Sequence, residues 1–129
     1  MTNKTRFLSV VDDELDIMSL FRYALSQIED TSVIGFTDSV HALEHFKLNQ
    51  SNYSLILSHF RMPIMDGVQL LKEAKSINPK VKTLLISAYA VNDEDFEQGD
   101  CVDALLQKPI TIPDLIDAVE TQISSSHLS

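Results

Sequence analysis

Side chains that can bind a metal ion or an anion follow short apolar runs of the sequence. They are Asp12 and Asp13 after one run, His59 after another, Ser87 at the end of a third and Lys108 after a fourth. Carboxylate oxygens are ligands that Mg²⁺ prefers, and a hydroxyl with an ammonium group suits a phosphoryl group. One acidic pair would mean little, because loops are polar. The whole set, placed at the ends of matching runs, favours a site for a metal ion and a phosphoryl group.

The rest of the chain supplies the elements that such a site needs. Short apolar runs predict strands over 7–11, 32–36, 54–58, 81–87 and 102–107. Apolar residues at helical spacing predict helices over 15–28, after Asp38, over 68–77, over a short stretch 92–98 and after Thr111. Strict alternation predicts an α/β fold with a doubly wound, five-stranded parallel sheet. In such sheets the working site lies beyond the carboxyl ends of the strands, which is where the polar side chains fall.

Length and composition fit one domain in the cytoplasm. We expect a single domain over 1–129, with a core over about 6–124 and a tail over 125–129. The net charge of −9 disfavours direct binding to nucleic acid, whose phosphates an acidic surface repels. No apolar run approaches the roughly 20 residues that span a membrane, and the polar start lacks the apolar core of a signal peptide. The single cysteine, Cys101, is expected to be a buried thiol.

Four motifs together give the chain a specific resemblance to a known family. They are Val10-Val11-Asp12-Asp13-Glu14, Ser58-His59-Phe60-Arg61-Met62-Pro63 with Met65-Asp66-Gly67, Ile86-Ser87-Ala88, and Lys108-Pro109. In this order they resemble the response-regulator receiver domains of two-component signal transduction, and the resemblance covers about residues 6–124. It implies a flavodoxin-like sheet with strand order 2-1-3-4-5.

The resemblance also implies a role for each polar residue at the strand ends. Asp12 and Asp13 would hold Mg²⁺, with Asp13 as the direct ligand, and the backbone carbonyl of Arg61 would be a further ligand. Ser87 would donate a hydrogen bond to a phosphoryl oxygen. Lys108 would pair with the acceptor and its phosphate, and the peptide bond before the following proline is usually cis in the family.

The chain departs from the family at two positions. The phospho-acceptor aspartate lies three residues before the Met-Pro pair, and counting back from Met62 gives His59. Ser58 is not a substitute, because neighbouring residues on a strand point to opposite sides. The aromatic switch residue lies three positions before the lysine, where this chain has Leu105. Leucine has no ring or hydroxyl to couple Ser87 to a distant surface, although Tyr89 lies nearby in the sequence.

The sequence leaves four interpretations of His59 open. A neutral imidazole removes one negative charge beside the metal position, so we expect weak or absent Mg²⁺ binding and no aspartyl phosphate. The chain is then a degenerate receiver, or a normal receiver in which histidine has been substituted for aspartate. It could instead be a sensor of pH or of transition-metal ions, since imidazole titrates and binds such ions. The fourth interpretation is phosphorylation of His59 itself.

The function favoured by these motifs is that of a stand-alone receiver domain in a two-component pathway or phosphorelay. Its expected partners are a histidine kinase or phosphotransfer protein and a downstream protein, with a homodimer as a further option, and it is not expected to be an enzyme. The rival is a small Mg²⁺-dependent phosphotransfer or phosphatase enzyme on a related fold. Such enzymes use an aspartate after the first strand with an acid two residues later, a spacing that Asp12 and Glu14 match.

One pair of histidines lies outside this set. His41 and His45 are four residues apart on an expected helix, which places them on one face. Such a pair can bind a metal ion, but the sequence offers no third ligand. We therefore interpret the pair as part of an exposed polar face.

Overall fold

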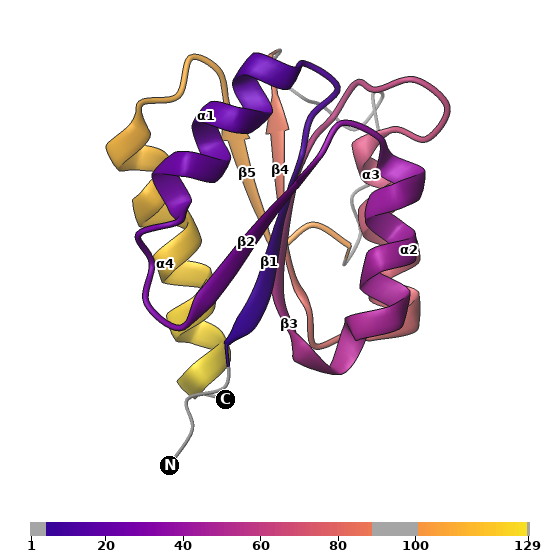
Figure 1. Cartoon of the computed structure of the whole chain (residues 1–129), viewed down its shortest axis with the longest axis vertical. Coiled ribbons are helices and arrows are strands. Elements are labelled where there is room, and N and C mark those ends of the chain that lie inside the picture. Colours follow the sequence, from indigo (N-terminus) through magenta and orange to yellow (C-terminus); the bar gives the residue numbers. More distant parts are fainter. Residues whose placement is uncertain (1–4, 89–100, 129) are drawn as a thin grey trace.

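The computed structural model describes residues 5–88 and 101–128 and has the predicted parallel sheet. The strands are β1 (Arg6–Val11), β2 (Thr31–Phe36), β3 (Tyr53–His59), β4 (Lys82–Ser87) and β5 (Ala104–Gln107). They are parallel in the order β2-β1-β3-β4-β5, as the resemblance implied. The helices are α1 (Leu15–Leu25), α2 (Ser39–Asn49), α3 (Gly67–Ile77) and α4 (Ile112–Leu128), and a short 3₁₀ turn (Gln50–Asn52) precedes β3. Helices α1 and α4 lie on one side of the sheet, and α2 and α3 on the other (Figure 1).

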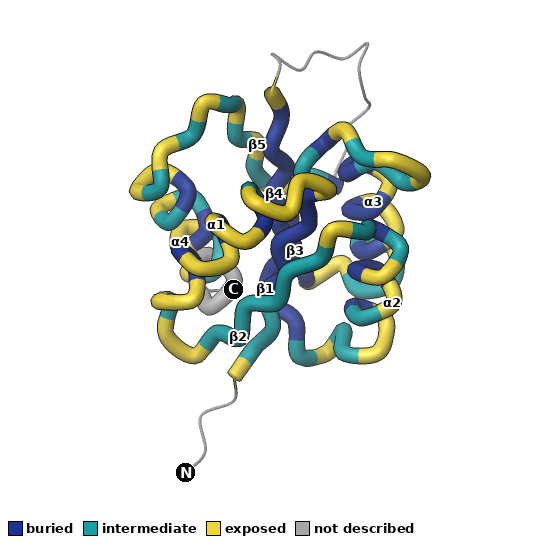
Figure 2. Tube along the Cα trace, turned by 45° about the horizontal axis from the view of Figure 1, so that its top comes forward, coloured by how far each residue is buried: buried dark blue, intermediate teal, exposed yellow. Residues whose placement is uncertain are grey.

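Two apolar cores form because both faces of the sheet are covered. Successive side chains of a strand point to opposite faces. Along β3, Ile56 packs in the core under α2 and α3, whereas Leu55 and Leu57 pack in the core under α1 and α4. A strand buried on both faces reads as an uninterrupted apolar run, which is what the sequence shows at its centre. Burial is deepest along β3 and β4, and the edge strand β2 is only half-buried (Figure 2).

Two predicted boundaries differ from those in the structure. The predicted tail over 125–129 is corrected, because α4 continues to Leu128; serine has moderate helix propensity, and no Gly or Pro interrupts the end of the chain. Helix α1 ends three residues before the predicted position 28, where the Ser26 hydroxyl donates to the carbonyl of Tyr23 at 2.6 Å. The short helix predicted over 92–98 lies outside the described residues.

The predicted helix starts at Asp38 and Thr111 are confirmed by hydrogen bonds. The carboxylate of Asp38 accepts from the backbone N–H of Val40 at 2.7 Å, and Thr111 Oγ1 accepts from the N–H of Asp114 at 3.1 Å. Each bond satisfies one of the N–H groups that have no partner in the first turn of a helix. Within the described ranges, no helix is long and apolar enough to cross a membrane.

An ion pair and several hydrogen bonds connect α3, β4 and the start of β5. Lys75 Nζ lies 2.8 Å from Asp103 Oδ2, which also accepts from the backbone N–H of Thr83 at 2.9 Å. The Thr83 hydroxyl donates to the carbonyl of Cys101 at 2.6 Å, and the Cys101 thiol is buried as predicted. Burial alone would raise the pKa of Asp103, but the Lys75 ammonium and the Thr83 N–H outweigh it and hold the pKa below its ordinary value.

This cluster predicts a pH-dependent contribution to stability. Because the pKa of Asp103 is lower in the folded chain, its carboxylate stabilises the fold above the unfolded pKa of about 4 and loses that effect as the pH falls further. The Asp103→Asn variant should therefore lower the free energy of unfolding by about 1–2 kcal/mol at neutral pH. Denaturant titrations should show that the difference shrinks in acid. Asp117→Asn, at an exposed position of α4, is the control; an equal loss at every pH would contradict the assignment.

Candidate functional site

The carboxyl ends of β1 and β3 bring three of the predicted site residues together. Val11 is paired with Ser58, so Asp12 and His59 follow at the same level of the sheet. One ligand atom from each of Asp12, Asp13 and His59 lies within 4.8 Å of the others. Asp12 is buried, His59 is half-buried and Asp13 is exposed. The predicted convergence of these three side chains is therefore present in the structure.

Ser87 and Lys108 occupy the ends of the next two strands. Ser87 is the last residue of β4 and is buried, and its carbonyl accepts from the N–H of Lys108 at 2.8 Å. The Lys108-Pro109 peptide bond is cis, as the resemblance implied. Burial raises the pKa of Asp12, and the positive charge of Lys108 is among the groups that oppose the rise. The five predicted residues thus share one edge of the sheet.

Asp12 is held by the backbone and by its surroundings. Its Oδ1 accepts from the N–H of Glu14 at 2.9 Å, which fixes the direction of the carboxylate. Burial raises the pKa of Asp12 above its ordinary value, and the charge of Asp13 adds to the rise. The Glu14 N–H and the charges of His59 and Lys108 act in the opposite direction without cancelling it. A divalent cation would offset the cost of this buried charge.

The imidazole of His59 has one engaged nitrogen and one that lacks a partner. Nδ1 lies 3.2 Å from the backbone carbonyl oxygen of Arg61. A carbonyl can only accept, so Nδ1 carries the proton in this contact. Nε2 is buried and has no hydrogen-bond partner among the described residues. In the neutral ring Nε2 then presents a lone pair, a group that is rarely left buried and unused.

The loop after β3 and the start of α3 hold the backbone of His59 in place. The N–H of Phe60 donates to the carbonyl of Ile86 at 2.8 Å, and the N–H of Gly67 donates to the carbonyl of Phe60 at 2.7 Å. A Cβ atom at Gly67 would overlap the carbonyl oxygen of His59, so the start of α3 packs directly on the backbone of the site residue. Ser58 is fully buried, and its hydroxyl donates to the carbonyl of His59 at 3.0 Å. The backbone at position 59 is therefore held on several sides.

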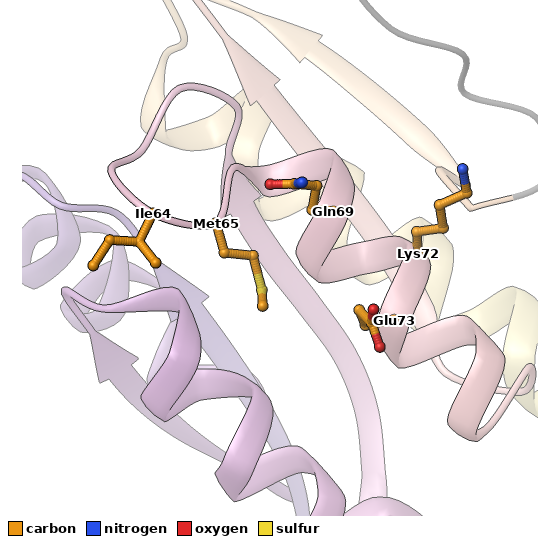
Figure 3. A pocket seen from close by; sticks show the side chains of 5 residues that line it. All are labelled: Ile64, Met65, Gln69, Lys72 and Glu73. Atoms are coloured by element: carbon orange, nitrogen blue, oxygen red, sulfur yellow. The ribbon is translucent and has the colours of Figure 1, made fainter.

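A hollow of about 360 Å³ lies beside this loop but is separate from the site. Its lining residues are Ile64, Met65, Gln69, Lys72 and Glu73 (Figure 3). Ile64 is 89% exposed and has a φ of 70°, a backbone conformation that β-branched residues rarely adopt. None of the lining residues belongs to the group around His59, so we do not assign the metal position to this hollow.

Other residues singled out in the sequence have different surroundings. Leu105 is 41% exposed on β5, and Tyr89 lies outside the described residues. His41 is exposed, as the prediction of an exposed polar face expects, and its Nδ1 lies 3.8 Å from Oδ2 of Asp38. That interpretation is wrong for His45, whose Nδ1 lies 2.7 Å from the hydroxyl of Tyr53.

The His45 and Tyr53 side chains form a cluster that sequence reasoning missed. Their rings contact the rings of Phe7, Phe36 and Phe46 at centroid distances of 5.0–5.7 Å. Burial lowers the pKa of His45 and raises the pKa of Tyr53 to about 12, so both groups are kept neutral. The apolar residues at helical spacing around His45 were the available signal for its packing against the sheet.

Comparison with known proteins identifies the chain. Residues 8–120 match the response regulator receiver domain family. The chain belongs to this family. The response regulator receiver protein CpdR from Brucella abortus is 28% identical to this receiver domain, and the match covers 92% of this chain and 96% of CpdR. The transcriptional regulatory protein ZraR from Klebsiella oxytoca is 30% identical over 93% of this chain but only 27% of its own length.

Solved structures agree with the fold. A receiver domain protein from Clostridium thermocellum superposes with a TM-score of 0.85 at 24% identity, covering 95% of this chain and 98% of that one. A protein from Neptuniibacter caesariensis has a TM-score of 0.85 at 26% identity, covering 98% and 93%. This receiver domain spans about 28% of the length of the regulator GlrR from Escherichia coli, a relative that it also matches.

Membership of the family fixes the general role. Receiver domains act in two-component signalling, where they interact with histidine kinases or phosphotransfer proteins, and they are typically signalling modules without enzymatic activity. They generally bind Mg²⁺ through acidic residues, and this receiver domain has the Asp12 and Asp13 part of such a site.

The donor set of this receiver domain fits Mg²⁺ poorly. Mg²⁺ requires near-octahedral oxygen coordination at about 2.0–2.1 Å and gives up its water reluctantly. His59 offers nitrogen at the third protein position, and its buried Nε2 has no other partner among the described residues. Imidazole suits Zn²⁺, Ni²⁺ and related ions, whereas carboxylate, carbonyl and water suit Mg²⁺. The chemistry of position 59 therefore differs from that of an all-oxygen magnesium site.

Proposed function

We propose that this receiver domain signals by binding protein partners and does not form an aspartyl phosphate. The observation that carries the proposal is the imidazole of His59 beside Asp12 and Asp13, with one ligand atom of each within 4.8 Å of the others. The spacing to Met62-Pro63 supports the assignment of His59 to the family's phospho-acceptor position. An imidazole cannot form the acyl phosphate that a carboxylate forms. It also leaves the metal position with one negative charge fewer, so Mg²⁺ binding is weak or absent in this form.

The remaining site residues keep the roles that the family pattern assigns. Ser87 and Lys108 bind phosphoryl oxygens or another small anion, and Asp12, Asp13 and the Arg61 carbonyl form the metal side of the site. The proposal is supported by the shared edge of the sheet on which these groups lie and by the effect of the Lys108 charge on Asp12. Leu105 occupies the switch position without an aromatic ring, so signalling does not use the usual aromatic flip.

The partners follow from this role. We propose that a histidine kinase or phosphotransfer protein and a downstream protein bind the domain, and that the domain acts as a single receiver unit in the cytoplasm, either alone or as a homodimer. The match covers 96% of CpdR, so CpdR is about as long as this one receiver domain, and this supports the proposal of a single receiver unit. The net charge of −9 supports partners other than nucleic acid or an anionic membrane.

A phosphodonor assay tests the proposal. The full chain and the His59→Asp variant are incubated with acetyl phosphate and Mg²⁺, and the intact mass is measured under conditions that preserve phosphohistidine. We expect a phosphoryl adduct on the variant and none on the wild type. An adduct on the wild type at His59 would replace the proposal by histidine phosphorylation, and an adduct at Asp12 or Asp13 would contradict it.

The same samples address the enzymatic alternative. A phosphatase would need Asp12 as its nucleophile, but Asp12 is 3% exposed and its Oδ1 already accepts from the Glu14 N–H. We therefore expect no hydrolysis of a generic phosphoester with Mg²⁺. Turnover that disappears in Asp12→Asn would favour the enzyme.

A further inference from the structure

The group formed by Asp12, Asp13 and His59 has the composition of a site for a late first-row transition metal. Two carboxylates and one imidazole supply three ligand atoms that lie within 4.8 Å of one another. Atoms bound to one ion at about 2.0–2.2 Å are separated by roughly 3–4.4 Å, so a small inward rotation of side chains is needed. Asp13 is exposed and can make that rotation at little cost. Three protein ligands with a fourth position open to solvent is a familiar arrangement for Zn²⁺.

His59 is already oriented as a metal ligand. Metal-binding histidines usually donate the N–H of the other ring nitrogen to a carbonyl or carboxylate, which fixes the tautomer and the ring direction. Here Nδ1 lies 3.2 Å from the carbonyl oxygen of Arg61, and Nε2 is buried with no hydrogen-bond partner among the described residues. The lone pair on Nε2 is therefore left available to a ligand. A purely structural histidine would be expected to use both nitrogens.

The surrounding charges suit a divalent ion. Asp12 is buried at 3% exposure and the exposed Asp13 follows it directly, so a second negative charge acts on Asp12, opposed by the charges of His59 and Lys108. The buried carboxylate of Asp12 is costly without a compensating positive charge. An ion bound between these carboxylates and Nε2 would offset the repulsion between the carboxylates and would also give Nε2 a partner.

The other histidines whose side chains are described do not form a competing site. His45 uses Nδ1 for the hydroxyl of Tyr53 and is surrounded by aromatic rings. His41 is exposed on the same helix and lies 3.8 Å from Asp38. Nothing brings a third ligand to this pair among the described residues, where the group around His59 is the one set of three or more metal-binding side chains found.

We propose that Asp12, Asp13 and His59 bind Zn²⁺ or a related late transition-metal ion in preference to Mg²⁺. This inference rests on the proposed function, because it gives the site without a phospho-acceptor a different ligand. The metal then occupies the position that Mg²⁺ takes in other receiver domains.

Metal titrations of the full chain test the inference at one fixed neutral pH. ZnCl₂ and MgCl₂ are titrated separately by calorimetry, and the imidazole nitrogens are followed by ¹⁵N NMR. We expect one Zn²⁺ per chain, bound at least about tenfold more tightly than Mg²⁺, with the largest shift at Nε2 of His59. His59→Gln should weaken Zn²⁺ binding by about tenfold or more, and His41→Gln should leave it unchanged. His59→Asp should move the preference toward Mg²⁺.

Each other outcome overturns the inference. It is wrong if Zn²⁺ leaves the His59 nitrogens unchanged, if Mg²⁺ binds as tightly as Zn²⁺, or if His41→Gln abolishes binding while His59→Gln does not. The direct His59 resonance keeps the test valid even if a variant folds poorly. These titrations contain no phosphodonor. Failure to select Zn²⁺ therefore removes only this inference, whereas a phosphoryl adduct on the wild type removes the proposed function.

Discussion

The His59→Asp variant is expected to bind beryllofluoride in the presence of Mg²⁺, whereas the wild type is expected not to respond. Aspartate restores a carboxylate beside Asp12 and Asp13 and thus one further negative charge at the metal position. A unit charge about 4 Å from a cation contributes about 4 kcal/mol at an effective dielectric of 20, and a divalent ion feels this more strongly. Desolvation of the new carboxylate removes part of that gain. A few kcal/mol remain, which is on the order of a hundredfold in Mg²⁺ affinity.

The substitution also changes the hydrogen bonding around the site. The contact between His59 Nδ1 and the Arg61 carbonyl is lost, so that contact no longer competes with a metal ion for the carbonyl oxygen. The new carboxylate can then bind beryllofluoride in the way that it would accept a phosphoryl group. By the roles that we propose for them, Ser87 and Lys108, at the ends of the next two strands, would bind its fluorine atoms.

Backbone amide NMR spectra measure this response. We expect beryllofluoride with Mg²⁺ to shift resonances of His59→Asp around residues 12, 59 and 87, with no such shifts in the wild type. The matched control is His59→Asn, which has the shape of aspartate without its charge and should stay silent. A response from His59→Asn would show that shape alone restores the site. The absence of shifts in both variants would mean that the loss of function extends beyond position 59.

The position of the site could be predicted because it follows from parallel strands. The carboxyl ends of such strands meet at one edge, so residues that directly follow β1 and β3 must be neighbours, and Asp12, Asp13 and His59 are. The cores could be predicted for the same reason, since a strand covered on both faces is apolar throughout. No knowledge of side-chain contacts was needed for either result.

The details of His59 could not be predicted from spacing. Its Nδ1 contacts a backbone carbonyl two residues away, and that contact depends on the path of the loop, which no side-chain pattern encodes. The packing of His45 was missed for a related reason, because helical spacing does not show which side chain of the following strand, here Tyr53, a helical residue meets. The end of α4 was placed too early because three serines suggest a tail, although nothing after them stops a helix.

The second large effect is expected from Gly67→Ala, which should destabilise the fold and displace the site. A Cβ atom at this position would overlap the carbonyl oxygen of His59 and would lie 2.9 Å from Cδ1 of Leu85. Alanine gains up to about 1 kcal/mol over glycine in a helix. Forced overpacking in a close-packed region costs about 1–3 kcal/mol, and here a backbone atom has to move. The clash should therefore outweigh the helical gain.

Gly35→Ala is the matched control because its neighbours are different in kind. A Cβ atom at Gly35 would meet the sulfur of Met18 and lie 3.1 Å from Cδ of Arg22, and both groups belong to flexible side chains that can rotate aside. Chemical denaturation should show a clear loss of stability for Gly67→Ala and a loss below about 1 kcal/mol for Gly35→Ala. The His59 imidazole resonances should shift only in the Gly67 variant. Equal losses would mean that the contact with the His59 backbone does not hold the site residue in place.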